Sequence, residues 1–226
     1  MSFRMSRGER SFNYLNVTVL ALLAFVTIYP FMYVIFASFS DAASLMKHQG
    51  LLVFPLGFQT QAYKMVFANP ILLTSFFNST IYVVVGSAIS MLLTILGAYA
   101  FSRRGTMWGS SLMLLLVFTM WFSGGLIPFY LLVKDLNMIN SRWAMLIPRA
   151  ISTYNLIVMR TAFAAVPDSL EESARIDGAK DLTILFRIIV PLCLPVVAVV
   201  ALFYSVGKWN AWFDAMLFLN IRNLFP

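Results

Sequence analysis

Charged residues are scarce in this sequence of 226 residues. Asp, Glu, Lys and Arg together make up 11% of it, whereas they make up about a quarter of an ordinary soluble domain. Apolar residues account for 61%. This balance excludes an ordinary water-soluble enzyme and favours an integral membrane protein.

Cysteine and histidine are almost missing. The sequence contains one cysteine, Cys193, and one histidine, His48, so it can form neither an internal disulfide nor a cysteine-based metal site. We expect no metal site. A membrane-embedded enzyme also becomes a weak alternative, because little material remains for a catalytic cluster.

The basic residues outnumber the acidic ones, 16 to 9. They lie between long uncharged stretches instead of clustering on one soluble face. This distribution points to lipid headgroups rather than to nucleic acid. We therefore expect contact with membrane lipid and no nucleic-acid partner.

Long apolar intervals predict membrane-spanning helices. About 20 apolar residues in a helix cross the hydrocarbon core of a bilayer, and helices satisfy their own backbone groups there. Five intervals qualify: 11–40, 65–102, 105–133, 143–159 (interrupted by Arg149) and 188–207. Ser123-Gly124-Gly125 followed by Pro128 indicates a break in the third. The fold class expected is an all-α polytopic membrane bundle, with residues 1–226 as a single transmembrane domain.

The positive charges predict the orientation. With a cytoplasmic N-terminus, nine basic residues lie inside and six outside, in the sense of the positive-inside rule. Arg4, Arg7 and Arg10, together with the turn that contains Arg103 and Arg104, carry most of this bias. Because the chain stops abruptly at Pro226 after a polar turn, we also expect a sixth span to be missing from this chain.

The segment 161–187 differs from an ordinary loop. It holds five of the nine acids: Asp168, Glu171, Glu172, Asp177 and Asp181. Ser169 and Glu172 predict an N-terminal capping box, and Gly178 predicts the helix end. The helix so framed, 170–177, is about 12 Å long and marginal in water by itself. It therefore needs a docking surface, for which Leu170, Ala174 and Asp177 share one face.

A longer pattern in this segment resembles a known family. Glu172-Ser173-Ala174, three residues, Gly178, nine residues and Ile188-Ile189-Val190-Pro191 are similar to the EAA motif of permease subunits of bacterial ABC importers. Ser173 and Val190 depart from the pattern Glu-Ala-Ala and Ile-x-Leu-Pro. Other stretches are similar to the carbohydrate-uptake, maltose-permease branch: Tyr29-Pro30, Asn78-Ser79, Ile147-Pro148 and Trp209-Asn210. Residues 209–215 with Leu219-Asn220 resemble permeases for oligosaccharides released from plant or algal polysaccharides.

The resemblance implies a type I ABC importer permease that moves a carbohydrate, in particular an oligosaccharide, across the bacterial inner membrane by alternating access. It implies that the segment 161–187 carries a coupling helix seated on an ATPase, formed by Glu171, Glu172, Ser173, Ala174, Asp177, Gly178 and Ala179. The implied partners are a second homologous permease, two cytoplasmic ATPases that bind ATP and Mg, and an extracytoplasmic solute-binding protein. A Gly-rich phosphate-binding loop with its Lys is absent from the sequence. The chain is thus expected to be no enzyme and to hold no cofactor.

Five polar residues in or near the spans are candidates for the substrate path: Asn78, Tyr82, Arg149, Tyr154 and Asn155. The alternatives are ordinary. Arg149 is close enough to Trp143 to extend its charge to the headgroups, and polar side chains in spans often join helix to helix. Trp121, Phe122, Trp209 and Trp212 fit either sugar stacking or an interfacial aromatic belt.

Two rival functions remain at this point. An ion-coupled secondary transporter predicts acids buried within spans, whereas every acid here lies outside the apolar cores. An ABC permease for another class of solute would carry the same coupling motif.

Overall fold

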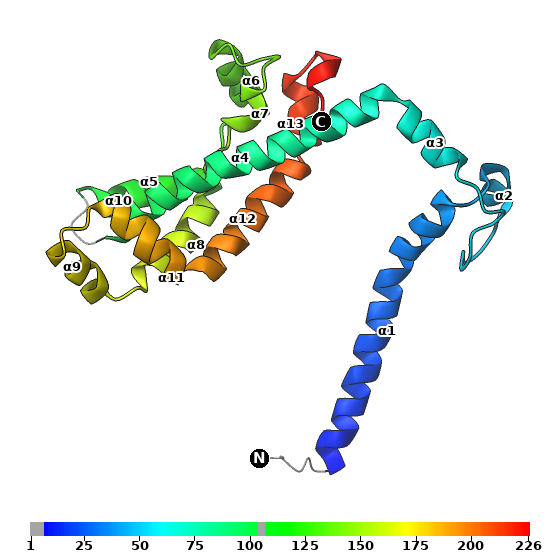
Figure 1. The fold of residues 1–226 in the computed structure, drawn as a ribbon, viewed down its shortest axis with the longest axis horizontal. Helices are drawn as coiled ribbons and strands as arrows, with labels where there is room; N and C mark the ends of the chain where they lie inside the picture. Colours follow the sequence, from blue (N-terminus) through cyan, green and yellow to red (C-terminus); the bar gives the residue numbers. More distant parts are fainter. Residues whose placement is uncertain (1–6, 104–106) are drawn as a thin grey trace. The chain divides into compact units, whose positions relative to one another are not determined.

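The computed structural model describes residues 7–103 and 107–226, and every element in these ranges is helical (Figure 1). The elements are α1 (Arg7–Ser38), α2 (Ala42–Lys47), α3 (Gln61–Ala68), α4 (Pro70–Ser102), α5 (Gly109–Trp121), α6 (Leu126–Asp135), α7 (Trp143–Leu146), α8 (Thr153–Ala164), α9 (Asp168–Ile176), α10 (Asp181–Ile184), the π-helical turn η1 (Leu185–Ile189), α11 (Val190–Leu192), α12 (Leu194–Trp209), α13 (Trp212–Phe218) and the 3-10 turn η2 (Arg222–Leu224). The expected all-α fold is confirmed. Arg4, Arg104 and Gly105, which entered the predictions of orientation and of the third span, lie outside the described residues.

Two helices in the described ranges are long and apolar enough to cross a membrane, Gly8–Ser38 within α1 and Pro70–Ser102. Two further pairs of helices pass the same test only if each sharply bent pair counts as one span. The structure therefore contains two to four candidate spans by length and composition. The remaining predicted spans are broken, and each break has a local cause.

The third predicted span breaks where its sequence indicated. α5 and α6 meet at 118° across residues 122–125, and Gly125 has a φ of +86°. This left-handed backbone favours glycine because it has no Cβ. The expected weak point at Ser123-Gly124-Gly125 is confirmed.

The fourth predicted span, 143–159, is not one helix, so this expectation was wrong. α7 ends at Leu146 and α8 begins at Thr153. Pro148 has no N–H with which to continue the helix, and Arg149 then adopts a φ of +58°. Arg149 consequently lies in a turn between two short helices instead of inside a span.

The fifth predicted span begins earlier than residue 188 and is bent. The helical run Asp181–Leu192 meets Leu194–Trp209 at 89°, with Cys193 at the corner. Pro195 occupies the first turn of α12, where the missing N–H leaves no helical hydrogen bond unmade. Pro191 lies inside the helical run, just after the π-helical turn η1. The Cys193 thiol lies 3.6 Å from the carbonyl oxygen of Ala162, to which it donates.

The chain divides into two compact units, up to Pro70 and from Ile71 onward. In the first unit the loop after α2 folds back on α1, and the backbone N–H of Leu52 donates to the Tyr29 hydroxyl at 2.9 Å. Asp41 caps α2 by accepting from the Ser44 N–H. This hydrogen bond lowers the pKa of the Asp41 carboxyl.

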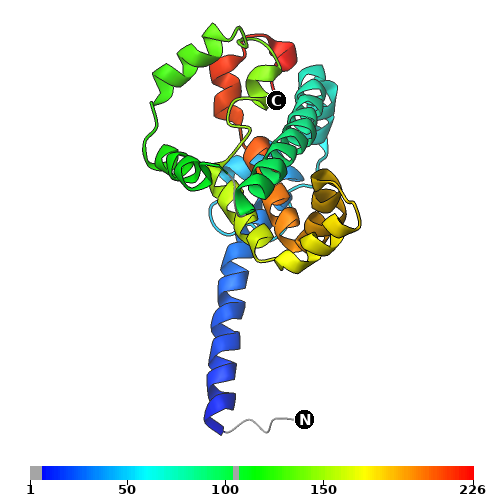
Figure 2. The same cartoon turned by 90° about the vertical axis from the view of Figure 1, so that its left-hand side faces the viewer.

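The second unit has its main core between α4, α8, η1 and α12, and Figures 1 and 2 show α8 and α12 alongside α4. The helices approach closely at Gly97, where an added Cβ would lie 2.9 Å from the Leu156 side chain. The Thr94 hydroxyl, fully buried, forms a 2.7 Å hydrogen bond with the Tyr204 hydroxyl. α4 thus packs against its neighbours along its length.

The two ends of α4 contact different parts of the second unit. Asn78 and Tyr82 bind the backbone of residues 223–225, whereas Tyr99 and Arg103 bind α9. At 1.5 Å per residue, residues 78 and 99 are about 31 Å apart along the helix, close to the thickness of a bilayer's hydrocarbon core. These two groups of contacts therefore lie at opposite ends of one membrane-length helix.

Candidate functional site

α9 begins two residues earlier than predicted, and its expected capping box is wrong. Its N-cap residue is Pro167, whose ring has no hydrogen-bonding group. Ser169 lies within the helix, and its carbonyl oxygen accepts a 2.9 Å hydrogen bond from the Ser173 hydroxyl. Asp168 and Glu171 occupy the first turn, where their charges face the positive end of the helix dipole. Acidic residues, instead of a serine cap, stabilise this start.

The end of α9 confirms the role expected for Gly178. This glycine has a φ of +79° and donates to the Arg175 carbonyl at 3.0 Å. Ala179 donates to the Ala174 carbonyl at 2.9 Å. The two bonds together form a Schellman motif, which ends a helix and turns the chain sharply. The turn sends the backbone directly into α10.

The two faces of α9 differ in what they contact. Glu171 is buried, and Ala174 is half-buried against the main core. Glu172, Ser173 and Ile176 are exposed, with Ile176 86% accessible. The face expected to dock, Leu170 with Ala174 and Asp177, is therefore only partly free. The outward face is formed by Ser169, Glu172, Ser173 and Ile176.

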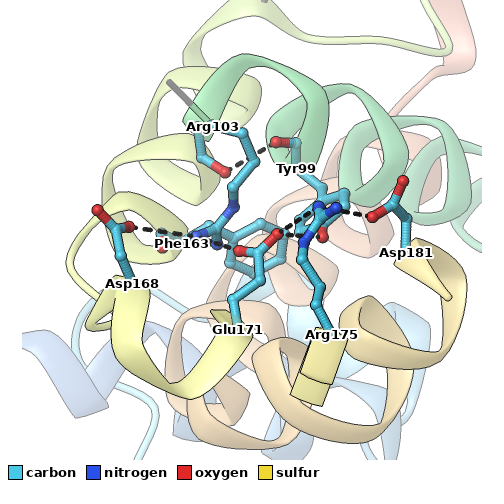
Figure 3. A network of polar contacts seen from close by, with 8 residues as sticks. Tyr99, Arg103, Phe163, Asp168, Glu171, Arg175 and Asp181 are labelled. Atoms are coloured by element: carbon cyan, nitrogen blue, oxygen red, sulfur yellow. Dashed lines mark hydrogen bonds and ion pairs between the residues drawn. The ribbon is translucent and has the colours of Figure 1, made fainter. Parts of the chain in front are cut away.

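A network of charges lies under the inward face of α9 and centres on Glu171 (Figure 3). One carboxylate oxygen, Oε2, lies 2.8 Å from Nη1 of Arg103. The other, Oε1, accepts from the Tyr99 hydroxyl at 3.0 Å and from Nη2 of Arg175 at 3.0 Å. The Glu171 and Arg103 side chains are only 9% and 16% exposed. Water screens such a pair far less than a surface pair.

The network extends from Glu171 to the neighbouring helices. Nη2 of Arg103 donates to the Phe163 carbonyl of α8 at 3.2 Å, and Nη2 of Arg175 lies 2.7 Å from Asp181 at the start of α10 (Figure 3). The hydrogen bond to Glu171, with the nearby Asp181 carboxylate, raises the pKa of the Arg175 guanidinium. Through Arg103 and Arg175, the network around this carboxylate thereby joins α9 to α4, α8 and α10.

Sequence reasoning missed the partners of Glu171. Tyr99 and Arg103 are 72 and 68 residues away from it in the chain, a separation that no local pattern bridges. A weak signal was available, since two adjacent glutamates on a helix cannot face the same way. The structure separates them: Glu171 points inward and Glu172 outward.

Two of the predicted path residues hold the chain's own backbone. The Asn78 amide donates to the carbonyl oxygens of Asn223 and Phe225 at 2.8 and 2.9 Å. The Tyr82 hydroxyl donates to the Leu224 carbonyl at 2.6 Å. These contacts match the alternative in which polar residues join segments to each other.

The other three predicted path residues lie together. Arg149, Tyr154 and Asn155 contribute to the wall of a cavity of about 510 Å³ between the α7–α8 turn, α8, α12 and α13. Nη1 of Arg149 lies 3.3 Å from Oδ1 of Asp214, and its guanidinium lies 4.5 Å from the centre of the Phe129 ring. Arg149 thus has a carboxylate and an aromatic partner.

Lys208 and Tyr204 also line this cavity, and sequence reasoning assigned neither of them to a site. Nζ of Lys208 donates to the carbonyl oxygens of Met145 and Leu146 at 2.9 and 3.4 Å. Gly86 of α4 leaves room for this lysine, since an added Cβ would lie 3.2 Å from its side chain. By sequence, Lys208 looks like an ordinary charge at the end of a span.

The cavity is equipped to bind a polar molecule. It is lined by two cations and one carboxylate, together with the aromatic residues Tyr154, Phe203 and Tyr204. Within the described ranges, no three His, Cys, Asp or Glu side chains are grouped so that they could hold a metal ion. The arrangement suits recognition through hydrogen bonds and charge.

Comparisons with known proteins agree with the helical architecture. Residues 106–221 match the family described as binding-protein-dependent transport system inner membrane component. The chain is similar to a solved structure of a bacterial ABC transporter involved in the import of the acidic polysaccharide alginate, with a TM-score of 0.93 and 33% identity. That match covers all of this chain and 80% of the other. At this identity the likeness extends to the ABC importer permease fold.

Two relatives in Bacillus subtilis (strain 168) are also similar. The polygalacturonan/rhamnogalacturonan transport system permease protein YtcP is 43% identical over 218 residues, which cover 96% of this chain and 76% of the relative. The galactooligosaccharides transport system permease protein GanQ is 34% identical over 202 residues, which cover 84% of this chain and 68% of the relative.

Proposed function

We propose that this chain forms part of the route by which an ATP-driven importer moves a carbohydrate. The premise is that the chain belongs to the family of binding-protein-dependent transport system inner membrane components. The chain is a multi-pass ABC transporter permease of the inner membrane and is not itself an enzyme. The family implies an ATPase and a solute-binding protein as partners. We further propose two ATPases, which bind the ATP and Mg, and a second homologous permease.

The proposed solute is an oligosaccharide, and in particular an acidic one. The proteins similar to this chain are named for polygalacturonan, rhamnogalacturonan, galactooligosaccharides and the acidic polysaccharide alginate. The cavity fits such a solute because Arg149 and Lys208 outnumber the single carboxylate of Asp214. Tyr154 and Phe203, whose ring centres are 6.5 Å apart, offer faces for sugar rings. An ABC permease for another class of solute is the alternative.

The observation that carries the proposal is the position of α9. The helix is anchored on one side, exposed on the other, and joined through Gly178 to the bent helical run that becomes α12. We propose that Glu172, Ser173 and Ile176 contact the ATPase, and that Ala174, Asp177, Gly178 and Ala179 set the shape of this coupling segment. Glu171 supports it from within.

We propose a single permease domain over residues 1–226, with the coupling segment at 161–187 and the N-terminus in the cytoplasm. Five crossings are proposed, of which the fourth runs through α7, the turn at Arg149 and α8 instead of through one helix. The breaks in the third, fourth and fifth mark where backbone lines protein or a cavity. ATP binding moves the coupling segment, and the cavity alternates between the two sides of the membrane.

The test compares Glu172→Lys with Asp135→Lys, a matched reversal at an exposed acid at the end of α6. Both variants are expressed with the partner subunits, and uptake of a labelled acidic oligosaccharide is measured with co-purification of the ATPase. We expect Glu172→Lys to lose most of the uptake and the ATPase together, and Asp135→Lys to keep both. Normal uptake and normal ATPase retention by Glu172→Lys would refute the proposal.

A further inference from the structure

We infer that Glu171 and Arg103 are positioning residues that make α4 move together with α9, so that a displacement of α9 reaches the cavity through α4 as well as through α12. The inference rests on the proposed function, in which a partner ATPase moves α9. It adds a second mechanical route, and it assigns that route to one buried ion pair.

The contacts of Glu171 with α4 are direct and close together. Arg103 follows α4 immediately, and its Nη1 lies 2.8 Å from Oε2 of Glu171. Tyr99, one helical turn earlier, donates to Oε1 of the same carboxylate at 3.0 Å. Tyr99 of α4 and Arg103, the residue after α4, thus bind both oxygens of one α9 side chain (Figure 3). Because both charges are largely buried, pulling them apart would leave an uncompensated charge in protein.

The route from α9 to the cavity through α12 is less suited to transmitting a displacement. From Gly178 the chain passes through α10, the π-helical turn η1 and α11, and then turns by 89° at Cys193 before α12 begins. Each change of helical register is a place where a displacement can be absorbed by local bending. This route exists because the backbone is continuous, but it has several joints.

α4 has no comparable joint between Pro70 and Ser102, which form one helix of 33 residues. Its interior contacts reach the cavity. Gly86 packs against Lys208, Gly97 packs against Leu156, and Thr94 bonds to Tyr204, whose hydroxyl also accepts from the Ser152 N–H at 3.0 Å. Lys208, Ser152 and Tyr204 all line the cavity. A shift of α4 therefore acts directly on two residues of the cavity wall, Lys208 and Tyr204.

The burial of this carboxylate argues against a simpler interpretation, in which Glu171 forms part of the surface that the ATPase contacts. Its side chain is 9% exposed, and its partners Arg103, Tyr99 and Arg175 belong to this chain. Glu172, the next residue, is exposed on the opposite face. The two neighbours make a matched pair for experiment, since one substitution perturbs the inner joint and the other the outer surface.

The test uses the complete transporter in proteoliposomes and measures solute uptake and ATP hydrolysis in the same preparation. For Glu171→Gln we expect uptake per ATP hydrolysed to fall about tenfold, within the usual range of coupling between separate sites, while the ATPase stays bound. For Glu172→Gln we expect uptake, hydrolysis and bound ATPase to fall together, so that their ratio stays near that of the unaltered protein.

A double variant distinguishes a pairwise effect from general damage. Glu171→Gln with Arg103→Gln removes both charges, so we expect its uptake per ATP to be no lower than that of either single variant. If the complex with Glu171→Gln fails to assemble, Glu171→Asp and Arg103→Lys replace it. These variants keep the charges but change the length of the side chains, and we expect uptake per ATP hydrolysed to fall.

A distance measurement tests the movement itself. Spin labels at Leu170 on α9 and Leu92 on α4, both exposed, are introduced with Cys193→Ser. We expect their separation to stay constant on ATP binding in the otherwise unaltered complex and to change in Glu171→Gln. An unchanged uptake-to-hydrolysis ratio in Glu171→Gln, or a separation that changes even with the pair intact, would overturn the inference. A lack of ATP-dependent uptake by the unaltered complex would instead overturn the proposed function.

Discussion

The two ends of the second unit use charge in different ways. At the α9 end, Glu171 meets Arg103 and Arg175, and Arg175 also meets Asp181, so that each charge faces one of opposite sign. At the cavity end, Arg149 pairs with Asp214, whereas Lys208 donates to two carbonyl oxygens. Paired charges hold helices together, whereas the second cation of the cavity bonds to backbone carbonyl oxygens. Under the proposed function, this difference distinguishes a joint between helices from a solute site.

The strongest way to break the α9 end is Gly178→Pro. Proline fixes φ near −65°, whereas this position has +79° and donates its N–H to Arg175. We expect uptake to fall to about a tenth or less, because the helix end costs about 3 kcal/mol to reshape. Gly178→Asn is the control, since asparagine tolerates left-handed backbone; it should keep most of the uptake. Equal uptake by both variants would contradict this role of the turn.

The packing that joins the two ends is tested by Gly97→Ala. The added methyl group would lie 2.9 Å from the Leu156 side chain, and overpacking of this kind costs about 1–3 kcal/mol. We expect a lower thermal unfolding midpoint for the solubilised permease. Gly207→Ala, where an added Cβ meets open space, should leave the midpoint nearly unchanged. A similar midpoint for both variants would show that α4 and α8 can separate at little cost.

The role of charge in the cavity is tested by Lys208→Met, which removes the ammonium group that donates to the carbonyl oxygens of Met145 and Leu146. We expect uptake of an acidic oligosaccharide to fall about tenfold, equivalent to about 1.4 kcal/mol, and uptake of a neutral analogue to change less than about twofold. Lys134→Met in the exposed last turn of α6 is the control. Equal losses for acidic and neutral solutes would mean that Lys208 supports the cavity without selecting charge.

The smallest effect is expected for Tyr82→Phe. This change removes one hydroxyl, which donates to the Leu224 carbonyl at 2.6 Å, and a hydrogen bond of this type contributes about 1 kcal/mol. We expect a slightly lower unfolding midpoint with uptake selectivity unchanged. A change in selectivity between acidic and neutral solutes would restore Tyr82 to the substrate path.

Features governed by local rules could be predicted from the sequence. Gly178 is an example, because a helix end in left-handed backbone favours glycine wherever it occurs. The break near Gly125 follows from the same property. The EAA-like spacing identified the segment that became α9, although the serine cap within it was wrong because Pro167 already ends the preceding turn in extended backbone.

Features governed by distant contacts could not be predicted. Arg103 forms an ion pair with Glu171, 68 residues away in the sequence, and Asn78 binds the backbone of Asn223, 145 residues away. A polar residue in a span has the same local signature whether it faces a solute or another segment. The sequence therefore could not show that Arg149, Tyr154 and Asn155 line the cavity, whereas Asn78 and Tyr82 bind the chain's own backbone.

The shortness of α8 has a consequence for the barrier that a solute meets. Its 12 residues extend about 18 Å, well short of the roughly 30 Å that lipid tails occupy. In the proposed arrangement of five crossings, the turn that carries Arg149 therefore continues the crossing with non-helical backbone. Under the proposed function, the barrier that alternating access has to open and close at α8 is thinner than the bilayer.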